Sequence, residues 1–196
     1  MKWPYRWIKN NNIELVAHPE CFEEKYYDDE YIGTSMKKEK LDIVCDLNLT
    51  KEPVKVSDNI VFLGEIPQIN DFEKRAAIGK QNSGGKFEDD LVNDDSAIVY
   101  KSEDGLFIIT GCSHSGICNI IEYAKRVTGD NRIVGVIGGM HLFKIDNKLE
   151  KNIEYFKNNK IKKLYPCHCV SLKAKIEMGK RIEIHEVGVV TEICIN

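Results

Sequence analysis

Short apolar runs rich in β-branched residues alternate with amphipathic stretches in the second half of this chain. The apolar runs predict buried strands, and stretches with apolar positions three and four residues apart predict helices. A strand–helix–strand–helix–strand order is typical of a layered α/β fold, so we expect one domain over residues 1–196. The expected strands are residues 106–109, 132–137 and 162–165, and the expected helices are residues 117–127, 150–158 and 171–180.

The rest of the chain has a weaker pattern. Residues 96–101 lead through Asp104-Gly105 into the strand at residues 106–109, and Asp-Gly between two apolar runs predicts a hairpin. Residues 68–90 are polar and contain glycines, which is typical of a long loop. Further strands are expected at residues 13–17, 41–49, 54–63 and 182–195, a helix end at residues 1–9, and an irregular or partly helical segment at residues 20–41.

Composition and charge favour a soluble globular protein. The chain is 42% hydrophobic and 30% charged, and its 196 residues are enough for a buried core. The net charge of −3 argues against general nucleic-acid binding. We also expect no membrane association, since no apolar run is long enough to cross a bilayer and no signal-peptide core is present. Seven cysteines without the spacing of a disulfide framework indicate reduced thiols and a cytoplasmic location.

Three histidines follow the three consecutive strands predicted in the second half. His114, His141 and His168 each come directly after an apolar run, among small residues that let the backbone approach a ligand. Because parallel strands end at the same edge of a sheet, the three imidazoles are expected to converge there. Neutral imidazole is a common ligand of zinc and iron. Each histidine alone is better explained as a turn residue, but three in register favour a metal site.

Cysteines near the last histidine are a competing set of ligands. Cys167 and Cys169 flank His168 more tightly than the spacing of a structural zinc site allows. Neighbours on a strand point to opposite faces, so His168 and its flanking cysteines are not expected to share a metal. We interpret Cys112, Cys118 and Cys169 as small buried residues, with a reactive thiol at Cys112 as the alternative. His185 is expected to be a surface or core residue.

Three motifs together resemble one branch of the metallo-β-lactamase-fold superfamily. The motifs are residues 111–120, which contain Cys112 and His114, residues 137–142 around His141, and residues 166–169 around His168. This branch is similar to the dihydropterin ribofuranosylaminobenzene phosphate synthase of methanopterin biosynthesis. The likeness extends to residues 17–19, 63–67 and 93–96, and therefore to nearly the whole chain.

The resemblance implies a partial αββα sandwich with a metal site. It makes His114 and His168 metal ligands, and His141 either a ligand or a substrate contact. Zinc or iron would activate a water or a substrate oxygen, as in a metal-dependent hydrolase or transferase with a small, phosphate-bearing or ester-like substrate. The expected start of a helix near Ser113 favours binding of a phosphate or another anion. The predicted substrate-binding residues are Ser113, Ser115, Gly116, Gly139, Asp95 and His18.

The sequence departs from the superfamily in several places. The first metal motif, His-x-His-x-Asp-His, is not present, and Asp94 and Asp95 are the only carboxylates near a family motif. The last histidine continues as His168-Cys169-Val170-Ser171, where the branch usually has His-Cys-Thr-Gly. We therefore expect an N-terminally incomplete domain with sub-stoichiometric metal and little activity alone.

Two alternatives to an incomplete enzyme remain open. One is a non-catalytic binding or structural remnant, and the other is one half of a split enzyme whose partner chain supplies the first motif. In each case an uncovered apolar sheet would favour self-association, or pairing with a partner, around Trp3, Trp7 and residues 13–17.

Overall fold

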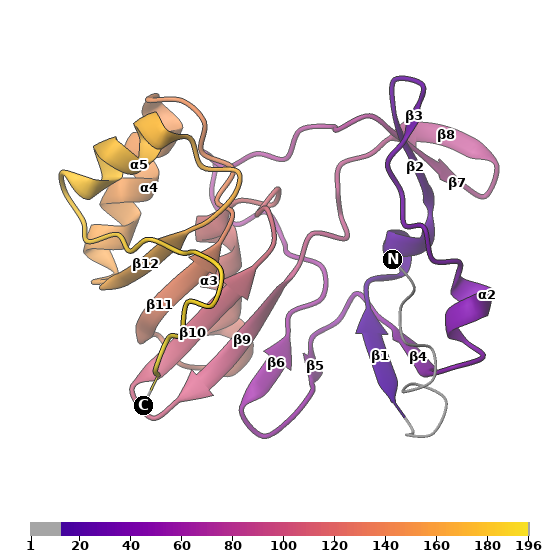
Figure 1. Cartoon of the computed structure of the whole chain (residues 1–196), viewed down its shortest axis with the longest axis horizontal. Helices are drawn as coiled ribbons and strands as arrows, with labels where there is room; N and C mark the ends of the chain where they lie inside the picture. The colour runs from indigo at the N-terminus through magenta and orange to yellow at the C-terminus, as the bar shows by residue number, and fades with distance from the viewer. Residues whose placement is uncertain (1–12, 196) are drawn as a thin grey trace. The chain divides into compact units, whose positions relative to one another are not determined.

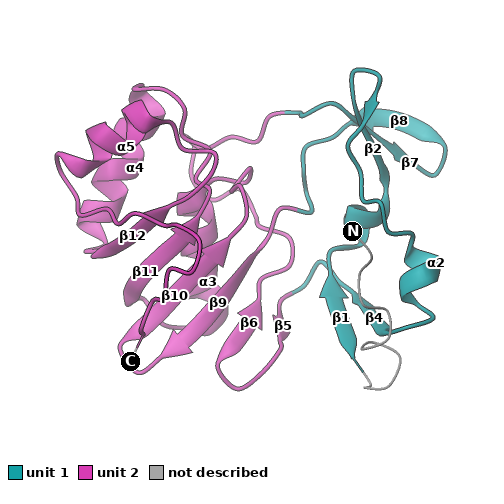
Figure 2. Ribbon diagram, viewed as in Figure 1, with its two compact units in different colours: residues 1–52, 77–94 teal, residues 53–76, 95–196 magenta. Residues whose placement is uncertain are grey.

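The computed structural model describes residues 13–195 and separates the chain into two compact units (Figures 1 and 2). Unit 1 consists of residues 1–52 and 77–94, and unit 2 of residues 53–76 and 95–196. The helix end expected at residues 1–9, with Trp3 and Trp7, lies outside the described residues. The single-domain expectation stays a prediction.

Unit 2 contains a six-stranded mixed sheet and three helices (Figure 1). The strand order is β12-β11-β10-β9-β6-β5, with β10, β11 and β12 parallel and the other neighbours antiparallel. Helices α3 and α4 connect the parallel strands, as crossover connections must. The elements are β5 (Val54–Lys55), β6 (Ile60–Phe62), β9 (Ala97–Ser102), β10 (Gly105–Thr110), α3 (Ile117–Thr128), β11 (Ile133–Gly138), α4 (Asn147–Asn158), β12 (Lys163–Pro166) and α5 (Leu172–Gly179).

The core of unit 2 is formed by the apolar faces of the sheet and of α3 and α4. Ile108 of β10, Ile120 of α3 and Ile153 of α4 are fully buried in one cluster, which explains why β-branched runs and helical spacing alternate in this region. Helix α3 ends at Gly129, whose φ of 74° gives the left-handed conformation that glycine adopts easily. Helix α4 begins where the Asp146 side chain accepts from the Leu149 amide at 3.0 Å.

Most elements predicted in this half are confirmed. The three strands and the helices α3 and α5 lie within two residues of the predicted bounds, whereas α4 begins three residues earlier than predicted. The hairpin is confirmed as well, because β9 and β10 pair around residues 103–104 with Gly105 opposite Ser102. The predicted strand at residues 54–63 is two short strands, β5 and β6, joined by a turn.

The strands predicted at residues 182–195 are wrong. In this segment the described structure has a single bridge, between Ile184 and Leu164 of the edge strand β12, and the His185 amide donates to the Leu164 carbonyl at 2.8 Å. Val189 and Val190 are 98% and 86% exposed. The exposed valines bury no apolar face, so alternation alone does not make a strand here.

Unit 1 contains a parallel pair of strands and a four-stranded antiparallel sheet. Residues 20–41, predicted to be irregular or partly helical, contain two strands, one short α-helix and most of a 3-10 helix. Residues 68–90, predicted to be a loop, contain two strands, and the strand predicted from residue 41 begins only at residue 46. The elements are β1 (Glu14–Ala17), η1 (Pro19–Phe22), β2 (Glu24–Tyr27), β3 (Glu30–Tyr31), α2 (Lys38–Leu41), β4 (Asp46–Leu49), β7 (Lys80–Ser83) and β8 (Lys86–Asp89).

A buried ion-pair cluster joins β2 to the segment that follows β8. The Lys25 ammonium lies 2.6 Å from Asp94 and 3.2 Å from Asp90. Asp94 therefore has a structural partner in unit 1, whereas Asp95 belongs to unit 2.

None of the helices within residues 13–195 is long and apolar enough to cross a membrane.

Candidate functional site

Three loops at one edge of the unit 2 sheet carry the three predicted histidines. They follow the parallel strands β10, β11 and β12, and backbone hydrogen bonds connect them to one another. The Gly139 amide donates to the Gly111 carbonyl at 2.7 Å, and the Leu142 amide donates to the Cys169 carbonyl at 3.0 Å. The loop after β11 is thus fixed to both of its neighbours, and the histidine-bearing loops share an edge as predicted.

Gly139 lies where two of these loops approach most closely. A Cβ atom at this position would lie 2.9 Å from the carbonyl oxygens of Gly111 and His168, and 3.0 Å from Nε2 of His168. The two carbonyl oxygens are main-chain atoms that cannot rotate away, so only glycine fits without a backbone shift. Gly139 sets the spacing of the loops, and its assignment to substrate binding stays a prediction.

Replacing Gly139 with alanine is therefore expected to destabilise the protein by roughly 1–3 kcal/mol, since the added methyl group forces the loops apart. The matched control is Gly111→Ala on the neighbouring loop, where a Cβ would meet nothing within 4 Å. Chemical denaturation of both variants measures the difference. Equal stability of the two variants would contradict the spacing role of Gly139.

His114 and His141 form a pair. Their ring centroids are 4.5 Å apart, and the His141 ring also lies edge-on against Phe143 at 4.9 Å. Burial lowers the pKa of His141, and the positive charges of His114 and Lys148 lower it further. His141 has a φ of 49°, which is uncommon outside glycine and often marks a functional position. The lowered pKa favours the neutral form of the His141 imidazole, which is the form that binds a metal.

Replacing His114 with glutamine should raise the pKa of His141 part of the way back to the ordinary value, because one of the positive charges disappears while burial remains. Histidine titration followed by NMR measures this change, with His185→Gln as the control that should leave the pKa of His141 unchanged. Because the pKa of His141 is lowered in the folded state, its contribution to stability is lost as the pH falls below the ordinary histidine value. An unaltered titration of His141 in His114→Gln would rule out the charge contact.

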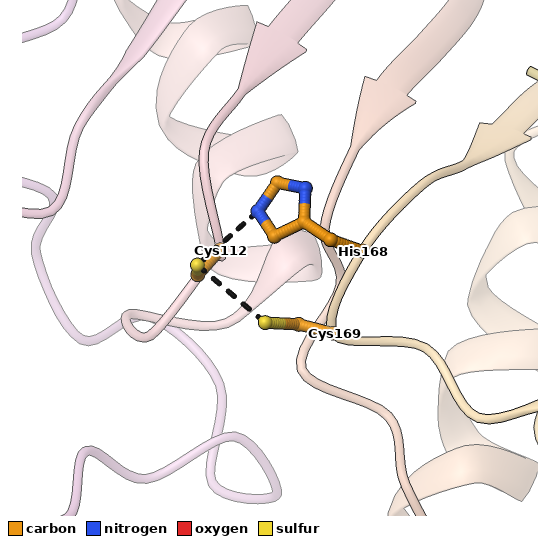
Figure 3. A group of neighbouring side chains, drawn as sticks. All are labelled: Cys112, His168 and Cys169. Atoms are coloured by element: carbon orange, nitrogen blue, oxygen red, sulfur yellow. Dashed lines mark hydrogen bonds between the residues drawn. The ribbon is translucent and has the colours of Figure 1, made fainter. Parts of the chain in front are cut away.

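His168 lies with two cysteines instead of with this pair (Figure 3). Its Nε2 atom is 3.2 Å from Sγ of Cys112, and the Cys169 thiol donates to the same sulfur at 3.5 Å. The prediction that His168 and Cys169 point apart is wrong, because β12 ends at Pro166 and Cys169 has a φ of 54°, so strand alternation does not extend to it. Whether all three histidines bind one metal stays a prediction.

The two cysteines in this group are half-buried and not the buried residues expected, whereas Cys118 is buried as expected. Burial raises the pKa of Cys112 to about 11, and the neighbouring Cys169 thiol raises it as well. A thiol with a raised pKa is protonated at neutral pH and is a poor nucleophile. This electrostatic environment argues against the alternative of a reactive Cys112 in the metal-free protein.

Comparison with known proteins gives two curated relatives from Methanocaldococcus jannaschii. The chain is 35% identical to an uncharacterised protein over 171 residues, which is 86% of this chain and 63% of the relative. It is 34% identical over 177 residues to 7,8-dihydropterin-6-methyl-4-(beta-D-ribofuranosyl)-aminobenzene-5'-phosphate synthase, covering 85% of this chain and 60% of the relative. The chain thus spans about three fifths of the length of these relatives. No family model matches it.

The solved structure of Tm1679, a metal-dependent hydrolase of the beta-lactamase superfamily, superposes with a TM-score of 0.74. The two are 25% identical, and the match covers 89% of this chain and 68% of Tm1679. The chain is a metallo-β-lactamase-fold protein. The predicted fold class is therefore confirmed, and the loops after β10, β11 and β12 are loops of a metallo-β-lactamase fold.

Four of the predicted substrate-binding residues of this metallo-β-lactamase-fold chain are buried and form hydrogen bonds within the protein. Ser113 is fully buried and donates to the Gly139 carbonyl at 2.6 Å. The Ser115 amide donates to Asp95 at 2.9 Å, and the Ser115 hydroxyl bonds the same carboxylate oxygen. Gly116 precedes α3 with a φ of 92° and donates its amide to the Ser113 carbonyl. These residues hold the loop after β10 in place.

At the N-terminus of α3, where the sequence suggested an anion site, two backbone amides have a carboxylate acceptor. Binding of an anion there stays a prediction. Glu73 lies in unit 2, in the segment between β6 and β7. It accepts from the Cys118 amide at 2.9 Å and from the Asn119 amide at 3.1 Å. Together with Asp95, this carboxyl occupies the helix end where a phosphate was expected. No local pattern pointed to Glu73, because it lies 45 residues before Cys118.

His18 has the local contact of a turn histidine. Its Nδ1 atom accepts from the Glu20 amide at 3.2 Å at the start of η1 in unit 1, and its side chain is buried. This hydrogen bond agrees with the turn interpretation that the sequence left open, and a role in substrate binding stays a prediction.

A small pocket of about 130 Å³ lies beside His141. Its lining combines an imidazole, an aromatic ring and two ammonium groups, and the Lys148 ammonium reaches the His141 carbonyl at 3.5 Å. The two ammonium groups suit a small anion beside the His141 imidazole, and the Asp146 carboxylate is the one negative group in the lining. The sequence signal that was missed is the pair Lys144, before α4, and Lys148, in its first turn. The lining residues are His141, Leu142, Phe143, Lys144, Asp146 and Lys148.

Proposed function

We propose that the chain contributes to the active site of a metal-dependent hydrolase or transferase with a small, phosphate-bearing or ester-like substrate. The observation that carries the proposal is the set of three hydrogen-bonded loops after β10, β11 and β12, with the His114 and His141 rings 4.5 Å apart. The relatives support it, because one is described as a metal-dependent hydrolase and another as the synthase of a 5'-phosphate.

The donor groups at this edge fit a divalent metal such as zinc or iron. His114, His141 and His168 offer imidazole nitrogens, and the lowered pKa of His141 keeps that ring neutral and able to bind. A bound metal would supply Lewis-acid polarisation of a water or a substrate oxygen. Lys144 and Lys148 beside His141 would attract and orient an anionic substrate group.

Ligands from outside these 196 residues are part of the proposal. The sequence contains no His-x-His-x-Asp-His, so we place the first metal cluster either elsewhere in a longer polypeptide or on a partner chain. Without that cluster the chain would hold metal sub-stoichiometrically and have weak activity alone. The second candidate is a non-catalytic binding protein, favoured by the internal hydrogen bonds of Ser113, Ser115 and Asp95.

Metal analysis combined with an activity assay tests the proposal. The purified protein is assayed on p-nitrophenyl phosphate mono- and diesters with zinc or iron(II), before and after chelation. We expect weak, chelator-sensitive turnover that the His114→Ala/His141→Ala double variant lacks and that His185→Ala retains. Turnover equal to wild type in the double variant would refute the assignment. No turnover with either metal, in a protein that binds phosphate, would favour the non-catalytic candidate.

A further inference from the structure

Two sulfur atoms and one imidazole nitrogen form a compact group at the edge of the unit 2 sheet (Figure 3). The ligand atoms of Cys112, His168 and Cys169 all lie within 4.8 Å of one another. Figure 3 shows the three side chains directed toward a common point, although they come from two loops more than 50 residues apart. We propose that these three residues form a zinc site with two thiolate ligands and one imidazole ligand.

The spacing of the ligand atoms is close to that of a tetrahedral zinc site. With Zn–S near 2.3 Å and Zn–N near 2.05 Å, two sulfurs lie about 3.8 Å apart and sulfur and nitrogen about 3.6 Å apart. The corresponding separations here are 3.5 Å between the sulfurs and 3.2 Å between Cys112 Sγ and His168 Nε2. These two pairs need to move by only a few tenths of an ångström to bind zinc, and the third pair, His168 Nε2 and Cys169 Sγ, lies within 4.8 Å.

The backbone already holds the ligands in this arrangement. Cys169 has a left-handed φ of 54°, which is costly for cysteine and persists only where the surroundings fix it. Its carbonyl accepts from the Leu142 amide at 3.0 Å, and the Gly111 carbonyl, next to Cys112, accepts from the Gly139 amide at 2.7 Å. Both thiol-bearing loops are thus anchored to the loop between them, and zinc binding requires little reorganisation.

The chemistry of the donors selects the metal and the type of site. Thiolate and imidazole ligands favour zinc over magnesium, calcium or manganese, which prefer oxygen. His168 is exposed and the two cysteines are half-buried, so the fourth coordination position faces solvent. Three protein ligands with one open position are typical of catalytic zinc sites, whereas structural sites close all four. The zinc site and the proposed active site share His168. This shared residue is the only point at which the inference rests on the proposed function.

Cobalt substitution and zinc titration of the reduced protein test the site. We expect the chain to hold less than one equivalent of metal as purified, added zinc to saturate the site at one equivalent, and cobalt(II) to give the near-ultraviolet absorption of sulfur-to-cobalt charge transfer. Cys112→Ser and Cys169→Ser should each reduce this absorption, because one of two thiolates remains, and should weaken zinc binding about tenfold or more, since each removes one of three protein ligands. The matched control is Cys167→Ser, because the Cys167 thiol is directed to the Tyr165 carbonyl at 3.4 Å and lies outside the group.

Two results would overturn the inference. One is cobalt binding without thiolate absorption, and the other is unchanged zinc affinity in the Cys112→Ser/Cys169→Ser double variant. Either result leaves the proposed function intact if His114→Ala/His141→Ala still removes metal-dependent turnover. Thiolate absorption that survives in the histidine double variant, without any turnover in the wild type, would instead support the zinc site and reject the enzymatic function.

Discussion

Replacing Lys25 with methionine should destabilise unit 1 by about 3–5 kcal/mol, the range for breaking a buried ion pair by removing one partner. Lys25 is 8% exposed, and its ammonium lies 2.6 Å from Asp94 and 3.2 Å from Asp90. Burial alone would lower the pKa of Lys25, but the hydrogen bond and charge of Asp94, together with Asp90, raise it overall. Without the ammonium, two carboxylates remain with no cation to offset their burial.

Hydrogen exchange at the amides of β2 and β7 measures this loss within unit 1, independently of unit 2. The matched control is Lys80→Met on β7, which removes an exposed ion pair with Asp89 at 2.5 Å and should cost less than about 1 kcal/mol. If Lys25→Met and Lys80→Met accelerated exchange equally, burial of the Lys25 ion pair would not explain its contribution to the stability of unit 1.

Replacing Glu73 with alanine should cost roughly 3 kcal/mol, because the end of α3 then loses its hydrogen-bond acceptor. Glu73 is 1% exposed, and its Oε2 atom accepts from Asn70 Nδ2 at 2.9 Å as well as from the Cys118 and Asn119 amides. Gly116, the residue before α3, has no side chain to cap the helix itself. Glu73 therefore acts as the cap from a distant part of the chain.

Glu73→Gln is the informative comparison. Glutamine keeps an acceptor oxygen for the two amides, and among residues 13–195 the other carboxyl oxygen of Glu73 has no hydrogen-bond partner to lose. We expect less than half of the alanine effect in urea denaturation of the whole protein. A glutamine variant as unstable as the alanine variant would show that packing or charge, and not the acceptor, matters.

The stability of the wild type should also depend on pH through Glu73. Burial raises the pKa of Glu73, although hydrogen bonds from Asn70, Asn119 and Cys118 and the charge of Lys148 oppose the shift. The folded state then binds the proton more tightly than the unfolded chain does, so this contribution is full below the ordinary glutamate pKa. It decreases as the pH rises from that value through the raised one, and Glu73→Gln should lack the decrease.

The sheet core and its histidine-bearing loops were predictable from the sequence, because their signals are local. The β-branched run before Thr110 and the helical spacing of Ile117, Ile120 and Ile121 encode buried faces within a few residues. Because parallel strands end at the same edge of a sheet, the three loops could be placed together without any interatomic distance. The hairpin of β7 and β8 was missed because β8 is exposed along its whole length and has no apolar alternation.

The contacts inside the site depend on backbone conformations that have no sequence signature of their own. Strand alternation placed Cys169 opposite His168, but the strand ends at Pro166 and a left-handed residue redirects the chain. Cys112 is 57 residues from Cys169, and Glu73 is 45 residues from Cys118, so neither contact lies within the range of a local pattern. Ser115 and Asp95, which the sequence assigned to substrate binding, form a hydrogen bond with each other across 20 residues, and no local pattern predicts that contact either.

The edge strand β12 has a further consequence for how the protein behaves at high concentration. An edge strand with free main-chain groups is a template to which a strand of another molecule can add, the first step toward fibrous deposits. Here the Leu164 carbonyl is already bonded by the His185 amide, and Ile184 lies in a parallel bridge with Leu164. Residues 184–185 form no strand, yet they occupy part of the edge at which fibril growth would begin.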